Sequence, residues 1–119
     1  MMMRRVVLAA AGLIGAGGVA AAAAASHAGE SRNLVAIAAI CLSHGPALLA
    51  IGLAGRSRVF QLAGCILALG TVLFAGDLAA REWAEHGLFG GAAPLGGGLM
   101  MLAWLGLAII GSLGGRNDS

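Results

Sequence analysis

The stretch that decides the fold is the apolar run LVAIAAICLSHGPALLAIGLAG at residues 34–55. An α-helix needs about 20 such residues to cross the hydrocarbon core of a bilayer. A histidine, His44, and a proline, Pro46, stand near the middle of the run. The stretch therefore predicts a transmembrane helix with an ionisable side chain close to its centre.

The rest of the chain has the same character. Of its 119 residues 60% are hydrophobic and only 10% are charged, and the mean hydropathy is +0.94. Soluble domains are usually about a quarter charged. The charges also cluster between the apolar runs, so we expect an integral membrane protein whose partner is the lipid bilayer. The net charge is a modest +2, and no basic stripe with interleaved aromatics is present, so we expect no nucleic-acid partner.

Four apolar runs are long enough to cross a membrane, at about residues 6–25, 34–55, 59–80 and 93–114. The connections between them are short, as in bundles whose helices alternate in direction. Pro94 suits the first turn of the last helix, where its missing N–H costs nothing. We therefore predict an all-α fold over residues 1–119, a single transmembrane domain forming an up-down bundle of four transmembrane helices.

The arginines predict the orientation. If both termini are cytoplasmic (N-in/C-in), five arginines lie inside and two outside, as the positive-inside rule favours. The inner group is Arg4, Arg5, Arg56, Arg58 and Arg116, and the outer pair is Arg32 and Arg81. Trp83 and Phe89 then fall at the outer interface. The first run also resembles a secretory signal, but it is long and rich in alanine and glycine, so we expect it to be retained as a helix.

Small residues recur on one side of three of the four runs. In lipid such stripes let helix backbones approach closely. We expect them to be packing faces inside the bundle, or else faces for a partner. The stripes are Gly12, Ala16, Ala20 and Ala24; Ala36, Ala39, Ser43, Ala47, Ala50 and Ala54; and Gly64, Ala68, Thr71 and Ala75.

His44 admits three interpretations. Polar groups at mid-membrane depth usually face the bundle interior, so His44 is expected to be neutral and hydrogen-bonded across the bundle, to a backbone carbonyl or to Thr71. A protonatable relay and a metal or haem ligand are the alternatives. His27 lies roughly 10 Å or more away in depth at about 1.5 Å per residue, and Cys41 with His44 does not fill a tetrahedral metal site.

Asp77 and Arg81 are four residues apart near the outer end of the third run, a spacing that brings them together on a helix. We expect an ion pair there. A sharper alternative joins Asp77 with His27 into a small proton- or cation-binding site. Glu82 and His86 have the same spacing but are expected in solvent. The candidate functional residues are His27, His44, Asp77 and Arg81.

No enzyme signature is present: the chain has no nucleophile elbow, no zinc-protease motif and no P-loop. Cys41 and Cys65 fall at different depths and are not expected to form a disulfide. We therefore expect a protein that is not an enzyme, with no cofactor and no metal.

Several short motifs carry a family resemblance in the same order along the chain. They are ASHAGE at 25–30, LSHGPALL at 42–49, FAGDL at 74–78, APLGG at 93–97, and Trp104 in the helix that follows. With them the chain resembles the small bacterial membrane proteins grouped as domain of unknown function family 423, which has an animal relative called transmembrane protein 256. Asp77 stands where that family has a neutral residue. The resemblance implies four membrane helices and no established activity.

Three functions fit these observations. The first is a small accessory or interaction subunit of a bacterial cytoplasmic (inner) membrane, with a membrane protein partner or as a homo-oligomer. The second is a small proton-coupled transporter using Asp77, or a membrane protein that binds lipid or a small molecule. The third is a redox or haem-binding subunit using His44.

Overall fold

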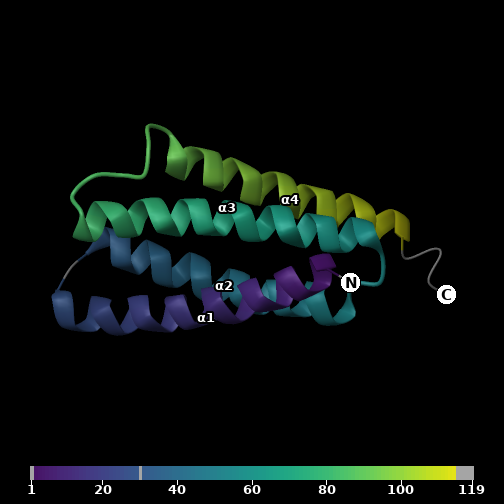
Figure 1. The fold of residues 1–119 in the computed structure, drawn as a ribbon, viewed down its shortest axis with the longest axis horizontal. Coiled ribbons are helices and arrows are strands. Elements are labelled where there is room, and N and C mark those ends of the chain that lie inside the picture. The colour runs from purple at the N-terminus through teal and green to yellow at the C-terminus, as the bar shows by residue number, and fades with distance from the viewer. Residues whose placement is uncertain (1, 30, 115–119) are drawn as a thin grey trace.

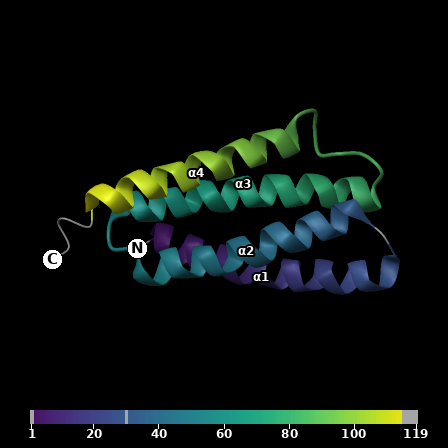
Figure 2. The ribbon, with the colours of Figure 1, turned by 180° about the vertical axis from the view of Figure 1, so that it is seen from behind.

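The structure is a computed structural model that describes residues 2–29 and 31–114. It consists of four helices, α1 (Met2–Ala28), α2 (Arg32–Ala54), α3 (Arg58–Trp83) and α4 (Ala92–Gly114), and no strand occurs in the described residues. Figure 1 and, from behind, Figure 2 show the chain reversing direction at each connection. Arg116 and Glu30 lie outside the described residues.

All four helices are long and apolar enough to cross a membrane, which confirms the predicted all-α class. The predicted runs and the helices agree to within a few residues, although α1 already begins at Met2 and α3 continues to Trp83. The longest dimension of the molecule is 50 Å, whereas a bilayer with its headgroups is about 40–45 Å thick. The helix ends therefore reach the headgroup region on both sides.

Serine side chains cap the starts of two helices, and a proline lies in the first turn of another. Ser31 caps α2 by accepting from the Leu34 N–H at 3.2 Å, and Ser57 caps α3 by accepting from the Phe60 N–H at 3.2 Å. Such caps satisfy N–H groups that a helix start leaves without partners. Pro94 falls in the first turn of α4, as predicted.

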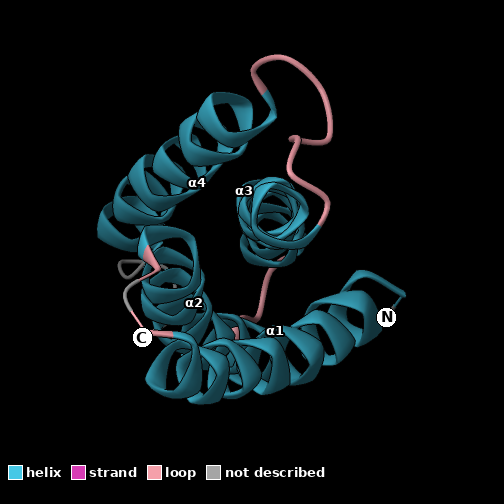
Figure 3. Ribbon diagram, turned by 90° about the vertical axis from the view of Figure 1, so that its left-hand side faces the viewer, coloured by secondary structure: helices cyan, strands magenta, loops and turns pink. Residues whose placement is uncertain are grey.

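The helices are not arranged as a closed square. Looking along the bundle, α1, α2 and α4 form an arc around α3 (Figure 3). The backbone of α3 packs against all three, α1 also packs along α2, and the backbone of α4 packs against α3 alone. The molecule is therefore two helical hairpins, α1–α2 and α3–α4, joined mainly through α3.

Each hairpin has a crossing point made by two glycines. A Cβ added to Gly45 would lie 3.1 Å from the Cα and N atoms of Gly15, so α1 and α2 touch through their backbones. In the second hairpin, a Cβ on Gly96 would lie 2.6 Å from the Gly70 carbonyl oxygen. Close approach of this kind lets dispersion forces hold helices together in lipid, where the hydrophobic effect between helices is absent.

The predicted packing stripe is confirmed on α3 only. Gly64, Ala68 and Thr71 are buried there. On α1 and α2 the stripes are not internal packing faces, since most of those residues lie on the surface of the bundle. The alternative, that they are faces for a partner, stays a prediction. The face of α1 that packs inside is built from Val7, Ala11, Ile14, Gly18 and Ala21, and that of α2 from Leu34, Ile37, Cys41, His44, Gly45, Leu48, Ile51 and Gly52. Almost every position of α1 from Ala9 to Ala25 is small or apolar, so spacing alone does not select a face.

Candidate functional site

His44 lies on the buried face of α2, as predicted, and Cys41 lies on the same face. Its Nε2 atom accepts a hydrogen bond from the Trp104 Nε1–H of α4 at 3.1 Å. Its Nδ1 atom lies 2.9 Å from the Ile40 carbonyl and 3.0 Å from the Ser43 hydroxyl. The predicted bond across the bundle is therefore present, but its partner is Trp104. The backbone carbonyl that His44 contacts belongs to its own helix, and the Thr71 hydroxyl instead donates to the Leu67 carbonyl of α3 at 2.7 Å.

The identity of the partner fixes the tautomer of His44. An indole N–H can only donate, so Nε2 carries a lone pair and the imidazole is neutral. The ring proton is then on Nδ1, where the Ile40 carbonyl accepts it. The two rings also meet edge to face, with centroids 5.7 Å apart and planes at 79°, a favourable aromatic geometry. Both nitrogens of His44 are engaged, so neither is free to hold a metal or haem.

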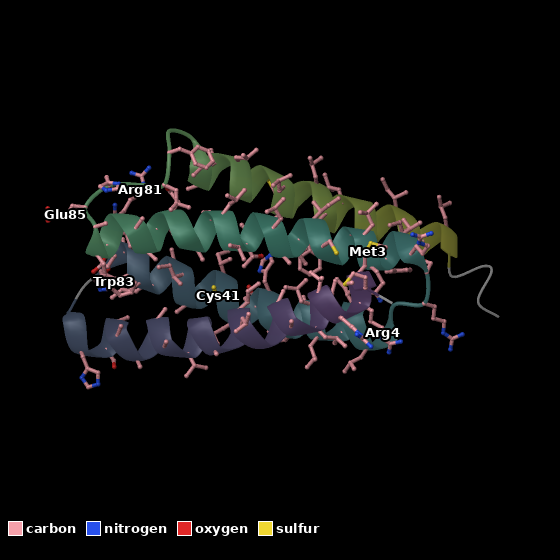
Figure 4. All side chains as sticks on the ribbon, in the orientation of Figure 1. Met3, Arg4, Cys41, Arg81, Trp83 and Glu85 are labelled. Carbon is pink, nitrogen blue, oxygen red and sulfur yellow. The ribbon has the colours of Figure 1, made fainter. Side chains whose placement is uncertain are left out.

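Asp77 is completely buried and both of its carboxylate oxygens have partners. Oδ2 accepts from the Arg81 Nε–H at 2.9 Å, which confirms the predicted pair. Oδ1 accepts from the backbone N–H of Leu88 at 2.8 Å. Leu88 belongs to the connection between α3 and α4, and Gly87 leaves no room for a Cβ above the carboxylate. Asp77 therefore holds this connection against the end of α3 through a hydrogen bond. The Arg81 side chain extends to the surface (Figure 4).

His27 does not join Asp77. Its side chain is exposed at the end of α1, and among the described residues the hydrogen-bond partners of the Asp77 side chain are Arg81 and Leu88. The sharper alternative, a joint proton or cation site, is therefore not assembled.

Glu82 was expected in solvent, and this expectation was wrong. It accepts from the Ser31 hydroxyl at 2.7 Å and from the Asn33 side-chain amide at 3.3 Å. These bonds tie the start of α2 to the end of α3. His86 is exposed, as predicted. Ser31 and Asn33 were not predicted as partners because they are remote from Glu82 in the sequence.

At the opposite end, Gln61 is a buried polar residue that the sequence prediction missed. Its Nε2 donates to the Ile51 and Gly55 carbonyls, both at 2.9 Å. Arg4 donates to the Leu53 carbonyl at 3.1 Å. The Leu53 and Gly55 carbonyls lie at the end of α2, where a helix leaves carbonyls without helical partners. The Ile51 carbonyl also accepts from the Gly55 N–H at 2.8 Å. The sequence carried a signal for it, since Gln61 is a carboxamide inside an otherwise apolar run, and polar residues within such runs usually face the bundle interior.

An apolar groove runs along the membrane-spanning part of the molecule between α1 and α3. Its volume is about 630 Å³. The floor is formed by Ile37 and Cys41 of α2, and Trp83 stands at one end. Much of the remaining wall is small: Gly17, Ala20, Ala21 and Ala24 from α1, and Ala75, Gly76 and Ala79 from α3. The residues Ala20 and Ala24 of the predicted α1 stripe thus line a groove instead of an internal contact.

No group of three or more histidine, cysteine, aspartate or glutamate side chains is placed to hold a metal ion within residues 2–29 and 31–114. Cys41 and Cys65 are both free thiols. The part of the chain that the structure describes thus offers three buried polar side chains that join one segment to another, those of His44, Gln61 and Asp77, and one long apolar groove.

Four apolar helices with buried polar anchors define a small multi-pass membrane protein. The chain belongs to the family described as Protein of unknown function (DUF423), whose family model matches residues 12–97. This confirms the resemblance drawn from the sequence motifs. The matched region includes His27, His44, Asp77 and Arg81 but ends before Trp104. The comparisons with curated proteins and with solved structures gave no match.

Proposed function

We propose that this protein is a non-enzymatic accessory subunit of a bacterial cytoplasmic membrane, which holds an apolar transmembrane helix of a partner protein in the groove between α1 and α3. The observation that carries the proposal is the lining of that groove. Seven of its positions are glycine or alanine, at 17, 20, 21, 24, 75, 76 and 79. Small residues let a helix backbone approach closely, whereas a lipid chain needs no such residues.

The open arrangement of the helices supports this role. The backbone of α4 packs on α3 alone, so α1 keeps one face toward the groove and another toward lipid. Trp83 is 66% exposed at the end of the groove, where an amphipathic aromatic ring at the headgroup level can contact the end of an inserted helix.

The alternatives are a small proton-coupled transporter and a membrane protein that binds lipid or a small molecule. The transporter is less well supported, because the Asp77 carboxylate already has Arg81 and Leu88 as partners. A lipid-binding role uses the same groove and differs in what occupies it, so the occupant decides between the two.

The test compares substitutions at two glycines of α1 that both have free space for a side chain. Neither Gly17 nor Gly12 has an atom within 4 Å of an added Cβ, but only Gly17 lines the groove. Gly17→Leu should fill the groove, and Gly12→Leu is the matched control. Native mass spectrometry after gentle extraction should show another polypeptide at fixed stoichiometry with the wild type and Gly12→Leu, and its loss with Gly17→Leu.

Two results would contradict the proposal. One is a chain that is strictly monomeric in its own membrane. The other is a bound mass that belongs only to lipid or a small molecule, lost in Gly17→Leu, which would favour the lipid-binding alternative.

A further inference from the structure

A second pocket lies at the end of the bundle opposite Asp77, and it differs in character from the apolar groove. It has a volume of about 310 Å³. Three arginines line it, Arg4, Arg56 and Arg58, together with Gln61, Met2 and Met3. It brings together the start of α1, the α2–α3 connection and the start of α3.

The charge at this end is unbalanced within the part of the chain that the structure describes. The described carboxylates, Asp77, Glu82 and Glu85, belong to the far end of α3 and the connection after it, away from Arg4 (Figure 4). The only ion pair among the described residues is that of Arg81 with Asp77, also at that end. The start of α3 adds the partial positive charge of a helix N-terminus. The pocket therefore favours an anion.

Gln61 supplies a second, independent observation. Its side chain is only 7% exposed, and its Nε2 atom is committed to the Ile51 and Gly55 carbonyls. Exchanging the nitrogen and oxygen of this amide would lose both hydrogen bonds. The acceptor Oε1 therefore points away from the Ile51 and Gly55 carbonyls. Oε1 is buried with no hydrogen-bond partner among the described residues. A buried acceptor without a donor is costly. Gln61 lines the pocket, so a ligand hydroxyl that reaches Oε1 from there would satisfy it.

We propose that this pocket binds the headgroup of an anionic phospholipid, with the phosphodiester held by Arg4, Arg56 and Arg58 and a headgroup hydroxyl donating to Gln61 Oε1. Arginine is well suited because its planar guanidinium can hold two phosphate oxygens at once. Met2 and Met3 provide an apolar rim beside the charged part. An amphipathic pocket at a helix end fits a lipid better than it fits a free ion, and basic pockets between transmembrane helices are known to take lipid headgroups. This inference does not depend on what occupies the apolar groove.

The test uses the full-length chain in bilayers that contain equal amounts of phosphatidylglycerol and phosphatidylcholine. Phosphatidylglycerol carries both the phosphodiester charge and glycerol hydroxyls. After extraction, native mass spectrometry should show it retained in preference to phosphatidylcholine. Each arginine near a charged headgroup contributes about fivefold in affinity, so Arg56→Gln and Arg58→Gln should each reduce the preference about fivefold.

Arg32→Gln is the matched control, because it removes the same charge from an exposed position at the other end of the bundle; it should leave the preference unchanged. The double variant Arg56→Lys/Arg58→Lys guards against misinsertion, since it keeps the positive charge that sets topology. It should still lose part of the preference, because lysine lacks the planar fork.

Three results would overturn the proposal. The first is equal retention of the two lipids by the wild type. The second is an equal effect of Arg32→Gln and Arg56→Gln, which would mean that only net charge matters. The third is displacement of phosphatidylglycerol by millimolar inorganic phosphate, which would make the phosphate group alone the ligand.

Discussion

At the scale of single residues, the buried side chains of His44 and Asp77 serve different connections. His44 joins α2 to α4 through Trp104, and those two helices have no backbone contact in the described residues. Asp77 joins the end of α3 to the connection that follows it. Both anchors therefore act on the placement of α4, the helix with the fewest neighbours.

Replacing Trp104 by phenylalanine keeps the aromatic ring but removes the donor to His44 Nε2. We expect the free energy of unfolding to fall by about 1 kcal/mol, within the range that hydrogen bonds between helices show in membrane proteins. Chemical or thermal unfolding of the protein in detergent measures this. Trp83→Phe is the control, since Trp83 is exposed, and a double-mutant cycle with His44→Leu should give a coupling energy of the same size. A cycle with no coupling would show that the bond has no energetic role.

Replacing Asp77 should loosen the α3–α4 connection. Asp77→Ala removes the acceptor of both the Leu88 N–H and the Arg81 guanidinium, so hydrogen exchange at the Leu88 amide should become several times faster. Asp77→Asn should fall between this variant and the wild type, because its amide oxygen can still accept from Leu88. Glu85→Gln is the control, as it removes one negative charge from an exposed position of the same connection. Equal protection of Leu88 in all these variants would contradict the anchoring role.

The sequence predicted part of this residue chemistry. The Asp77–Arg81 pair is local, so a spacing of four residues was sufficient to predict it. The Trp104 bond to His44 spans 60 residues, and the bonds of Glu82 to Ser31 and Asn33 are also long-range. Such partners depend on how helices cross, which a single sequence does not specify.

At the scale of helices, the crossing points are set by pairs of glycines. Helix existence was predictable because length and apolar content suffice. The buried face was not predictable on α1, where small residues surround the helix on all sides. Gly45, Gly70 and Gly96 differ from the other glycines because an added Cβ would meet the backbone of the neighbouring helix, whereas a Cβ on Gly15 would meet nothing within 4 Å. The sequence does not show which glycines lie at such a contact.

Gly96→Ala should therefore be destabilising by about 1–3 kcal/mol, the usual cost of forcing extra volume into a packed contact. Its new methyl group would meet the Gly70 carbonyl and the Phe74 backbone. The neighbouring Gly97 has nothing within 4 Å of an added Cβ, so Gly97→Ala should be neutral or slightly stabilising. Thermal unfolding of the two variants side by side measures the difference. Equal stability would show that α3 and α4 do not cross at this point.

At the scale of the whole molecule, charge is sorted between the two ends. One end carries the pocket lined by Arg4, Arg56 and Arg58, and the other carries the Asp77–Arg81 pair together with Glu82 and Glu85 (Figure 4). By the positive-inside rule the first end is predicted to be cytoplasmic. The four-helix architecture could be predicted from the sequence, but its open arc and its groove could not, because they depend on which helices remain unpaired.

This orientation can be tested by labelling single cysteines in a variant whose Cys41 and Cys65 are replaced by alanine. Ser57→Cys lies in the α2–α3 connection and Glu85→Cys in the α3–α4 connection. A membrane-impermeant maleimide added to intact cells should label the cysteine at position 85 and leave that at position 57 unmodified until the cells are opened. The reverse pattern would place both termini outside.

The glycine crossings also bear on how the chain is made. Each of them joins two helices that are consecutive in the sequence, Gly15 with Gly45 and Gly70 with Gly96. Synthesis proceeds from the N-terminus, so the N-terminal segments of a chain are the first that can fold. The α1–α2 hairpin contains its own backbone contact, so it can close while α3 and α4 are still being translated. α3 can then pack against the α1–α2 hairpin as the second hairpin forms. Each helix therefore has a packing partner that is adjacent to it in the sequence.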